Sequence, residues 1–213
     1  MSGEAHGGGY WRASPPPAAR RGEVEVALPG EAPLRLVTSG HTFSPRRLDP
    51  GTALLLRTLW QAYPAPGERA PERIADLGAG WGAIGLLLAR RFPAARVDLI
   101  EVNPAAAAAA AENARRLGLG NARVHQGDVS LLWPALAPHD LVVTNPPIRA
   151  GRRVYGPWLA QARDRLGAGG SFWFVARTAQ GANTLAALLA AALDDVAVVA
   201  RGGGYRVVRG RRA

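Results

Sequence analysis

From Arg73 onward, short apolar segments alternate with helical ones, and this alternation constrains the fold more than any other feature of the chain. Such a pattern specifies a parallel sheet that is covered by helices on both faces. The expected strands are Arg73–Leu77, Arg96–Glu101, Ala122–Gln126, Asp140–Thr144, Gly170–Ala176, Val196–Ala200 and Tyr205–Arg209. The expected helices are Ala83–Phe92, Pro104–Leu117, Arg152–Leu166 and Gln180–Leu193. The sequence therefore predicts an α/β protein with seven strands in its sheet.

The last two expected strands are joined by a link that is too short for a parallel crossover. The link contains Arg201-Gly202-Gly203, whereas parallel neighbours need a connection of about a dozen residues or more. We therefore expect the final strand to run antiparallel.

The segments before this core have a different character. Residues 1–22 are rich in Gly and Pro and are expected to form a flexible arm. Val24–Leu28 and Leu34–Thr38 alternate in polarity on either side of Pro29-Gly30, which predicts a β-hairpin. Thr52–Tyr63 is expected to be an apolar helix.

A linker is expected at residues 64–71, between that helix and the core. We therefore expect a single domain over residues 23–213, made of the hairpin and helix (23–63) and the catalytic core (72–213).

Composition removes several classes of function. The chain has no cysteine, which excludes disulfides, Cys-ligated zinc and thiol nucleophiles. Its histidines show no spacing typical of metal ligands, so no metal site is expected. No apolar run reaches the ~18–20 residues that a membrane span needs, and the N-terminal segment lacks a hydrophobic region of the signal-peptide type. A cytoplasmic location without a membrane partner is therefore expected.

The charge balance indicates a polyanionic partner. The 26 basic residues are all arginine and exceed the 16 acidic ones, which gives a net charge of +10. An excess of this size in a small domain favours nucleic acid, because each phosphate contact releases condensed counterions. A generally basic surface without such a partner is the alternative.

A glycine loop follows the first core strand and opens the next helix. Gly78, Gly80 and Gly82 would let the backbone approach a ligand, and the helix N-terminus offers free N–H groups. Asp76 leads the loop, and its negative charge suits an amino group better than a pyrophosphate. A tight turn without any ligand is the alternative.

Two acids follow the next strands. Glu101 ends the second core strand, about 20 residues beyond the glycines, where a carboxylate can accept both hydroxyls of a ribose. Asp128 follows the third strand, where it can bind an adenine amino group or cap the next helix.

The fourth core strand is followed by Asn145-Pro146-Pro147-Ile148. An amide oxygen beside a carbonyl held by proline gives two acceptors for the two N–H bonds of a planar amine. Holding both N–H groups favours rehybridisation towards sp³ and directs the nitrogen lone pair at an electrophile. No strong base is required, because the proton becomes acidic once the nitrogen is positively charged.

These motifs together resemble class I S-adenosylmethionine-dependent methyltransferases of the amino-methylating branch. More specifically, the chain is similar to the small-subunit rRNA guanine-N2 methyltransferase family and its single-domain archaeal-type relatives, from Tyr10 to Val208. Further stretches carry this resemblance, namely Ser39-Gly40-His41-Thr42-Phe43-Ser44 followed by Asp49-Pro50-Gly51-Thr52, Pro146-Pro147-Ile148-Arg149-Ala150-Gly151, and Gly203-Gly204-Tyr205-Arg206-Val207.

The resemblance implies a Rossmann-like sheet in the order 3-2-1-4-5-7-6 with strand 7 antiparallel. It also implies that Phe43, Asp49 and Thr52 lie near the cofactor or the reacting base. Many relatives carry an aromatic residue where this chain has Ile148, so the ring that stacks on the base is expected from Phe43, Trp81 or Tyr155 instead.

The expected cofactor is S-adenosyl-L-methionine. Its binding residues are expected to be Asp76, Gly78, Gly80, Gly82, Glu101, Asp128, Asn145, Phe43 and Thr52. The expected catalytic residues are Asn145, Pro146 and Pro147. The expected substrate-binding residues are Ile148, Arg149, Arg152, Arg153, Arg46 and Arg47, where the arginines would contact phosphates around the mouth of the site.

The sequence thus predicts methyl transfer to an exocyclic amine, with guanine N2 of small-subunit ribosomal RNA as the acceptor. The same machinery acting on tRNA, DNA or a protein glutamine is the alternative. A non-catalytic RNA-binding protein and a nicotinamide dehydrogenase are the rivals from other classes. The intact Asn145-Pro146-Pro147 argues against the first, and Asp76 with the proline pair disfavours the second.

Overall fold

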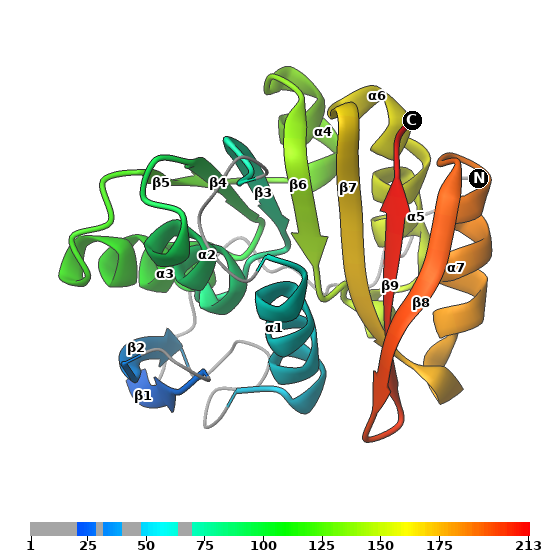
Figure 1. The fold of residues 1–213 in the computed structure, drawn as a ribbon. Coiled ribbons are helices and arrows are strands. Elements are labelled where there is room, and N and C mark those ends of the chain that lie inside the picture. Colours follow the sequence, from blue (N-terminus) through cyan, green and yellow to red (C-terminus); the bar gives the residue numbers. More distant parts are fainter. Residues whose placement is uncertain (1–20, 29–31, 40–47, 64–69) are drawn as a thin grey trace, which may run out of the picture.

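The computed structural model describes residues 21–28, 32–39, 48–63 and 70–213, without the side chains of Arg21 and Ser39 (Figure 1). Its elements are β1 (Arg21–Val26), β2 (Leu34–Ser39), α1 (Pro50–Ala62), β3 (Arg73–Leu77), α2 (Ala83–Arg91), β4 (Arg96–Glu101), α3 (Pro104–Arg116), β5 (Ala122–Gln126), α4 (Val129–Leu132), β6 (His139–Thr144), α5 (Arg152–Ala160), α6 (Ala162–Arg165), β7 (Leu166–Arg177), α7 (Ala182–Ala190), β8 (Asp195–Gly202) and β9 (Tyr205–Arg211). Short 3-10 turns lie at Trp133–Ala135, Ile148–Ala150 and Thr178–Gln180.

The main sheet has seven strands in the order β5-β4-β3-β6-β7-β9-β8. The pairs β3–β4, β3–β6, β4–β5 and β6–β7 are parallel, and β9 is antiparallel to both of its neighbours. Numbered along the core, this is the order 3-2-1-4-5-7-6 with an antiparallel last strand. The expected fold class is therefore confirmed.

Side chains of successive strand residues enter two different cores, as the two-residue period of a strand requires. Ile74 of β3 packs in the core under α1, α2, α3 and the β1–β2 hairpin, whereas the next residue, Ala75, packs in the core under α4, α5 and α7. Figure 1 shows the sheet between these two groups of helices. Burial on both faces explains why apolar residues follow one another in the central strands, as in Leu141-Val142-Val143 of β6, and do not alternate with polar ones.

The N-terminal hairpin pairs β1 with β2 in antiparallel register and is fastened to the core by Asn113 of α3. The buried Asn113 amide accepts a hydrogen bond from Val37 N–H at 2.7 Å and donates to the Val37 carbonyl at 2.9 Å. It also donates to the Trp81 carbonyl at 3.0 Å. One side chain therefore connects the hairpin, a helix and the glycine loop.

Several expected boundaries were wrong, and the reasons are local. The strand β1 begins at Arg21, inside the expected arm, because Arg21 and Gly22 pair with Ser39 and Thr38. The helix α1 begins at Pro50 and not at Thr52, because the Asp49 side chain caps it by accepting from Thr52 N–H.

The helix expected over residues 152–166 is divided into α5 and α6, and Leu166 is instead the first residue of β7. Leu166 is fully buried and pairs with His139 of β6, so sheet pairing outweighs local helix propensity there. The helix α7 begins only after Gly181, whose φ of +95° interrupts a right-handed helix.

The rest of the expected arm, the Pro29-Gly30 turn, the linker apart from Ala70 and Pro71, and the stretch from Gly40 to Ser44 lie outside the described residues.

Candidate active site

The carboxyl ends of β3, β4, β5 and β6 meet at one edge of the sheet, the lower edge in Figure 1. Ligands of open α/β sheets bind at this edge. It carries the glycine loop after β3, Glu101 at the end of β4, and Asn145 after β6. The hydroxyl of Thr144 donates to the Leu77 carbonyl at 2.7 Å and fastens the end of β6 to that of β3.

The glycine loop has a backbone conformation that residues other than glycine rarely adopt. Gly78, Gly80 and Gly82 have φ values of +71°, +59° and +90°. A Cβ atom on Gly82 would lie 2.7 Å from Cδ1 of Leu86, whereas one on Gly80 would meet no atom of the described residues within 4 Å. Gly82 thus permits packing inside the protein, while Gly80 borders open space in which a ligand can approach the backbone.

Both carboxylate oxygens of Glu101 accept hydrogen bonds from the backbone. Oε2 accepts from Gly80 N–H at 2.8 Å, and Oε1 accepts from Asn103 N–H at 2.7 Å. Burial raises the pKa of Glu101, and these two N–H groups oppose the rise. Each oxygen keeps further acceptor capacity, so the carboxylate is held in a fixed plane and can still accept from two ligand hydroxyls.

Asp76 is buried beneath the loop with one oxygen unpaired. Its Oδ2 accepts from Gly85 N–H at 2.8 Å, whereas Oδ1 has no hydrogen-bond partner among the described residues. Burial and the neighbouring charge of Glu101 raise the pKa of Asp76 to about 7, against the effect of the Gly85 hydrogen bond. A buried acceptor without a partner costs about 1–3 kcal/mol, which a cationic donor such as an ammonium group would offset.

Asp128 has a local structural role. It caps α4, because its Oδ1 accepts from Ser130 N–H at 2.7 Å, and its side chain is exposed. The capping role that was the alternative interpretation is therefore present, and contact with an adenine stays a prediction.

The amide of Asn145 is oriented by two acceptors from the segment that opens α1. Nδ2 donates to Asp49 Oδ2 at 3.1 Å and to Thr52 Oγ1 at 2.9 Å. With its nitrogen facing Asp49, the amide donates both of these hydrogen bonds. The amide oxygen then has no hydrogen-bond donor among the described residues and is free to accept from a ligand.

Asp49 is the centre of this network. Besides Asn145, it accepts from Thr52 N–H at 3.0 Å and from the hydroxyl of Tyr205 at 3.3 Å. Burial and the Asp49 carboxylate raise the pKa of Tyr205, which keeps the phenol protonated as a donor. A Cβ on Gly51 would lie 2.6 Å from the Tyr205 ring, so a glycine there allows the two segments to meet. Sequence reasoning missed Tyr205 as a site residue, although the Gly203-Gly204-Tyr205 stretch contained the signal.

The carbonyl of Pro146 accepts from Ile148 N–H at 2.8 Å. Pro147 between them has φ −74° and ψ 77°, the geometry of an inverse γ-turn. One lone pair of the Pro146 carbonyl is therefore used internally, and the second remains available.

The expected substrate-binding residues are only partly described. Ile148 is partly buried against the core under α5, whereas Arg149, Arg152 and Arg153 are exposed and form no ion pair with a described residue. Phe43, Arg46 and Arg47 lie outside the described residues.

Two of the three rings expected to stack on the base are buried in the protein. Trp81 is 4% exposed and Tyr155 is 7% exposed, so neither presents a free face to a base in this conformation. Phe43 is the remaining candidate and stays a prediction.

Within the described part of the chain, no group of three His, Asp or Glu side chains is arranged to hold a metal ion. No helix in that part is both long and apolar enough to cross a membrane.

The comparison with known proteins assigns the family. Residues 33–209 match the family described as methyltransferase small domain. The chain belongs to this methyltransferase family. The expected enzyme class and the expected methyl donor, S-adenosylmethionine, are thereby confirmed.

Relatives of the methyltransferase include uncharacterized protein YbxB of Bacillus subtilis (strain 168), 31% identical over 170 residues that cover 80% of this chain and 82% of YbxB. The ribosomal RNA small subunit methyltransferase C of Hahella chejuensis (strain KCTC 2396) is 32% identical over 172 residues, 78% of this chain and 44% of that protein. The structure of the T. thermophilus 16S rRNA N2 methyltransferase RsmC in complex with AdoMet and guanosine superposes with a TM-score of 0.80 and 26% identity, over 95% of this chain and 53% of that one. The methyltransferase thus spans about half the length of these ribosomal RNA methyltransferases.

The residues present fit S-adenosylmethionine. The unpaired Oδ1 of buried Asp76 at the end of β3, the space beside Gly80 that the described residues leave open, and the fixed carboxylate of Glu101 at the end of β4 all lie at the glycine loop. They offer, in turn, an acceptor for an ammonium group, a close backbone approach and acceptors for ribose hydroxyls.

Proposed function

We propose that this methyltransferase modifies an exocyclic amino group of RNA, with guanine N2 of small-subunit ribosomal RNA as the acceptor. The observation that carries the proposal is the orientation of Asn145, whose Nδ2 is held by Asp49 and Thr52 while Oδ1 is left to accept. A cytoplasmic location follows from such a substrate.

A planar aromatic amine needs acceptors for its two N–H bonds and a free direction for its lone pair. Asn145 Oδ1 and the second lone pair of the Pro146 carbonyl supply these acceptors on adjacent residues. Acceptors preorganised in this way stabilise the positive charge that develops on nitrogen during methyl transfer, because they need no reorganisation at that moment.

Among the described residues that bond Asn145, the one carboxylate is Asp49. It already accepts hydrogen bonds from Thr52 N–H, the Asn145 amide and the Tyr205 hydroxyl, so it is not free to act as a general base. An alcohol acceptor would need a base to remove its proton early, whereas an amine loses its proton after it has become cationic. The site therefore favours an amine over a hydroxyl group.

Asp76, Gly80 and Glu101 would hold the cofactor, which supplies a methyl group activated by a sulfonium. The choice of RNA is supported by the net charge of +10 and by the exposed arginines after β6. It is also supported by the relatives that act on ribosomal RNA, among which the T. thermophilus protein is named for N2.

Labelled methyl transfer tests the proposal. The full chain is incubated with methyl-labelled S-adenosylmethionine and, in separate reactions, unmodified 16S ribosomal RNA, small subunits, tRNA, DNA and bulk protein. Label in N2-methylguanosine of ribosomal RNA is the expected result. Label found only in tRNA, DNA or protein would overturn ribosomal RNA as the substrate and leave methyl transfer to an amino group in place.

Asn145→Ala tests the catalytic geometry in the same assay. Loss of one oriented hydrogen bond in the transition state should lower turnover about 100- to 1,000-fold. Calorimetry should show nearly unchanged affinity for the demethylated cofactor product, because Asn145 would contact the amine. The control is Gln61→Ala, which removes an exposed amide on α1. Turnover of a folded Asn145→Ala protein that matches this control would overturn the assignment.

A further inference from the structure

The chain after β6 carries far more positive than negative charge. Residues 145–213 include eleven arginines and three acidic residues, and these acids are Asp164, Asp194 and Asp195. Two of them are already paired with arginines, because Arg163 binds Asp194 and Arg209 binds Asp195 at 2.7 Å.

These two ion pairs lie at the amino-terminal end of β8 and the carboxyl-terminal end of β9. At that end Asp195 is aligned with Arg211 in the register of the two strands. The opposite end of the β8–β9 pair, where the two strands are linked, is at the same edge of the sheet as Asn145.

The linked end of β8–β9 and the adjacent end of β7 carry three arginines without any ion pair to a described acid. They are Arg177 at the end of β7, Arg201 near the end of β8 and Arg206 near the start of β9. Arg201 and Arg206 are direct cross-strand neighbours. Like charges at such positions destabilise a sheet, so their presence is explained better by an anionic ligand than by the stability of the fold.

Two of the three arginines are held in place by neutral groups. The Arg206 guanidinium donates to Asn183 Oδ1 of α7. The Arg177 guanidinium lies 4.6 Å from the centre of the Tyr205 ring. Both contacts position a cation and leave its charge uncompensated, which suits recognition of a phosphate.

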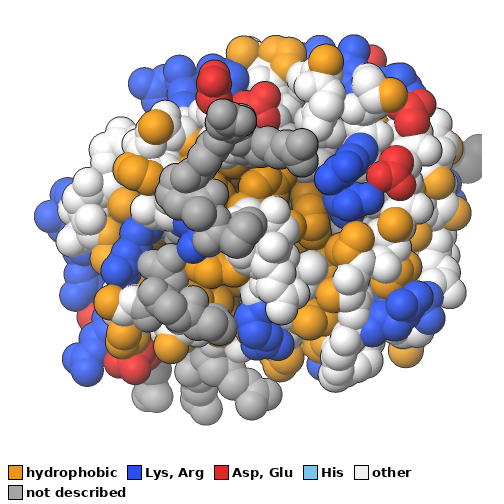
Figure 2. Space-filling model, viewed as in Figure 1, with side chains coloured by type: hydrophobic (Ala, Val, Ile, Leu, Met, Phe, Trp, Pro, Cys, Tyr) orange, Lys and Arg blue, Asp and Glu red, His pale blue; other side chains and the backbone are white. Residues whose placement is uncertain are grey.

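The linked end of β8–β9 borders the edge of the sheet that carries Asn145. Tyr205 bonds Asp49, and Asp49 bonds Asn145, so two side chains separate the Arg177 guanidinium from the catalytic amide. A Cβ on Gly202 would be 3.5 Å from Leu54 of α1, which confirms that the hairpin end packs beside the helix that carries Thr52. In Figure 2, the lower right of the face carries basic side chains without acidic ones, over β8 in Figure 1.

We propose that Arg177, Arg201 and Arg206 bind the sugar–phosphate backbone of the RNA beside the nucleotide that reaches Asn145. This surface adds to the arginines after β6 and rests on the proposed RNA substrate. Its contacts carry no sequence information but set the register in which a target base enters the site.

The test measures how the affinity for a labelled unmodified 16S rRNA transcript depends on salt. The variant Arg177→Gln/Arg201→Gln removes two exposed charges at the hairpin end. The control Arg115→Gln/Arg211→Gln removes two exposed charges from α3 and from the far end of β9, so both proteins have the same net charge. Two lost phosphate contacts should flatten the plot of log K against log salt by about 1.4–1.8 units. If wild type and variant bind equally at about 1 M salt, the variant should bind about 25- to 60-fold more weakly than wild type at ~0.1 M salt.

Affinity for S-adenosylmethionine should be the same in the wild type and both variants, because the cofactor carries no phosphate. Suppose that the wild type methylates RNA and that the two double variants have equal salt slopes. This result would overturn RNA binding by Arg177, Arg201 and Arg206 and leave the proposed function intact. A wild type that transfers no methyl to any RNA would overturn the proposed function and the surface together.

Discussion

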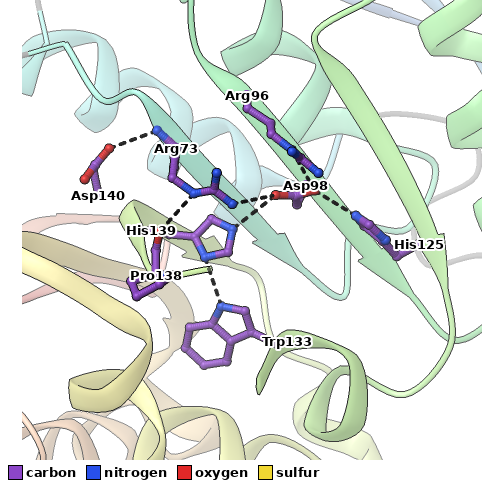
Figure 3. A network of polar contacts seen from close by, with 8 residues as sticks. All are labelled: Arg73, Arg96, Asp98, His125, Trp133, Pro138, His139 and Asp140. Carbon is purple, nitrogen blue, oxygen red and sulfur yellow. Dashed lines mark hydrogen bonds and ion pairs between the residues drawn. The ribbon is translucent and has the colours of Figure 1, made fainter. Parts of the chain in front are cut away.

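Replacement of Asp98 should change the dependence of stability on pH, because this buried carboxylate holds a second polar network away from the reactive edge (Figure 3). Its Oδ1 is 2.7 Å from His125 Nε2, and its Oδ2 is 3.3 Å from His139 Nε2. The guanidiniums of Arg96 and Arg73 lie 3.7 Å and 4.0 Å away. Asp98 therefore connects β3, β4, β5 and β6.

Burial by itself raises the pKa of Asp98, but the hydrogen bonds and charges of His139 and His125 outweigh it and lower the pKa from 3.8 to about 2. One pKa unit corresponds to 1.36 kcal/mol, so the shift is worth roughly 2–3 kcal/mol. Because its pKa is lower in the folded state than in the unfolded state, the Asp98 carboxylate contributes its full stabilisation above about pH 4. This contribution is lost as the pH falls through about 2.

Asp98→Asn should therefore lower the free energy of unfolding by about 2–3 kcal/mol at pH 7. The difference from wild type should shrink as the pH falls from 5 towards 2. Urea unfolding at several pH values measures this difference. Asp195→Asn is the control, because it breaks an exposed pair with Arg209 that is worth at most about 1 kcal/mol. A difference between Asp98→Asn and wild type that is constant from pH 5 to pH 2.5 would refute the reasoning.

Two further substitutions test the cofactor site and the attachment of the N-terminal β1–β2 hairpin. Glu101→Gln should weaken S-adenosylmethionine binding about 10- to 150-fold in calorimetry, because charge-assisted hydrogen bonds of ~1.5–3 kcal/mol are lost; unchanged affinity in a folded protein would contradict ribose binding by Glu101. Asn113→Ala removes three hydrogen bonds and leaves polar groups of Val37 and Trp81 without partners, so it should lower the free energy of unfolding by about 3–5 kcal/mol in urea. The exposed control Asn183→Ala should lose less than about 1 kcal/mol, and an equal loss in both variants would show that Asn113 does not fasten the hairpin.

The alternation of strands and helices, the glycine loop and the antiparallel final strand follow from the sequence alone. They are local properties, because apolar periodicity, helix propensity and the length of a link are set by neighbouring residues. The acids and the Asn-Pro-Pro motif could be assigned to the ends of strands for the same reason. In a parallel sheet, those ends necessarily meet at one edge. The sequence therefore determined the fold class and placed the candidate site residues at one edge of the sheet, and their roles stay predictions.

The tertiary structure decided which side chains act on one another. Leu166 starts a strand because His139 lies beside it, although its neighbours favour a helix. Trp81, a candidate for base stacking, is buried in the core. The orientation of Asn145 depends on Asp49, 96 residues earlier, and Asp49 in turn is bonded by Tyr205, 156 residues later. The pairing of Asp98 with two histidines and the separation of paired from unpaired arginines along β8 and β9 have the same origin. Hydrogen bonds and ion pairs act over a few ångströms, so the distances that decide them exist only after the chain has folded.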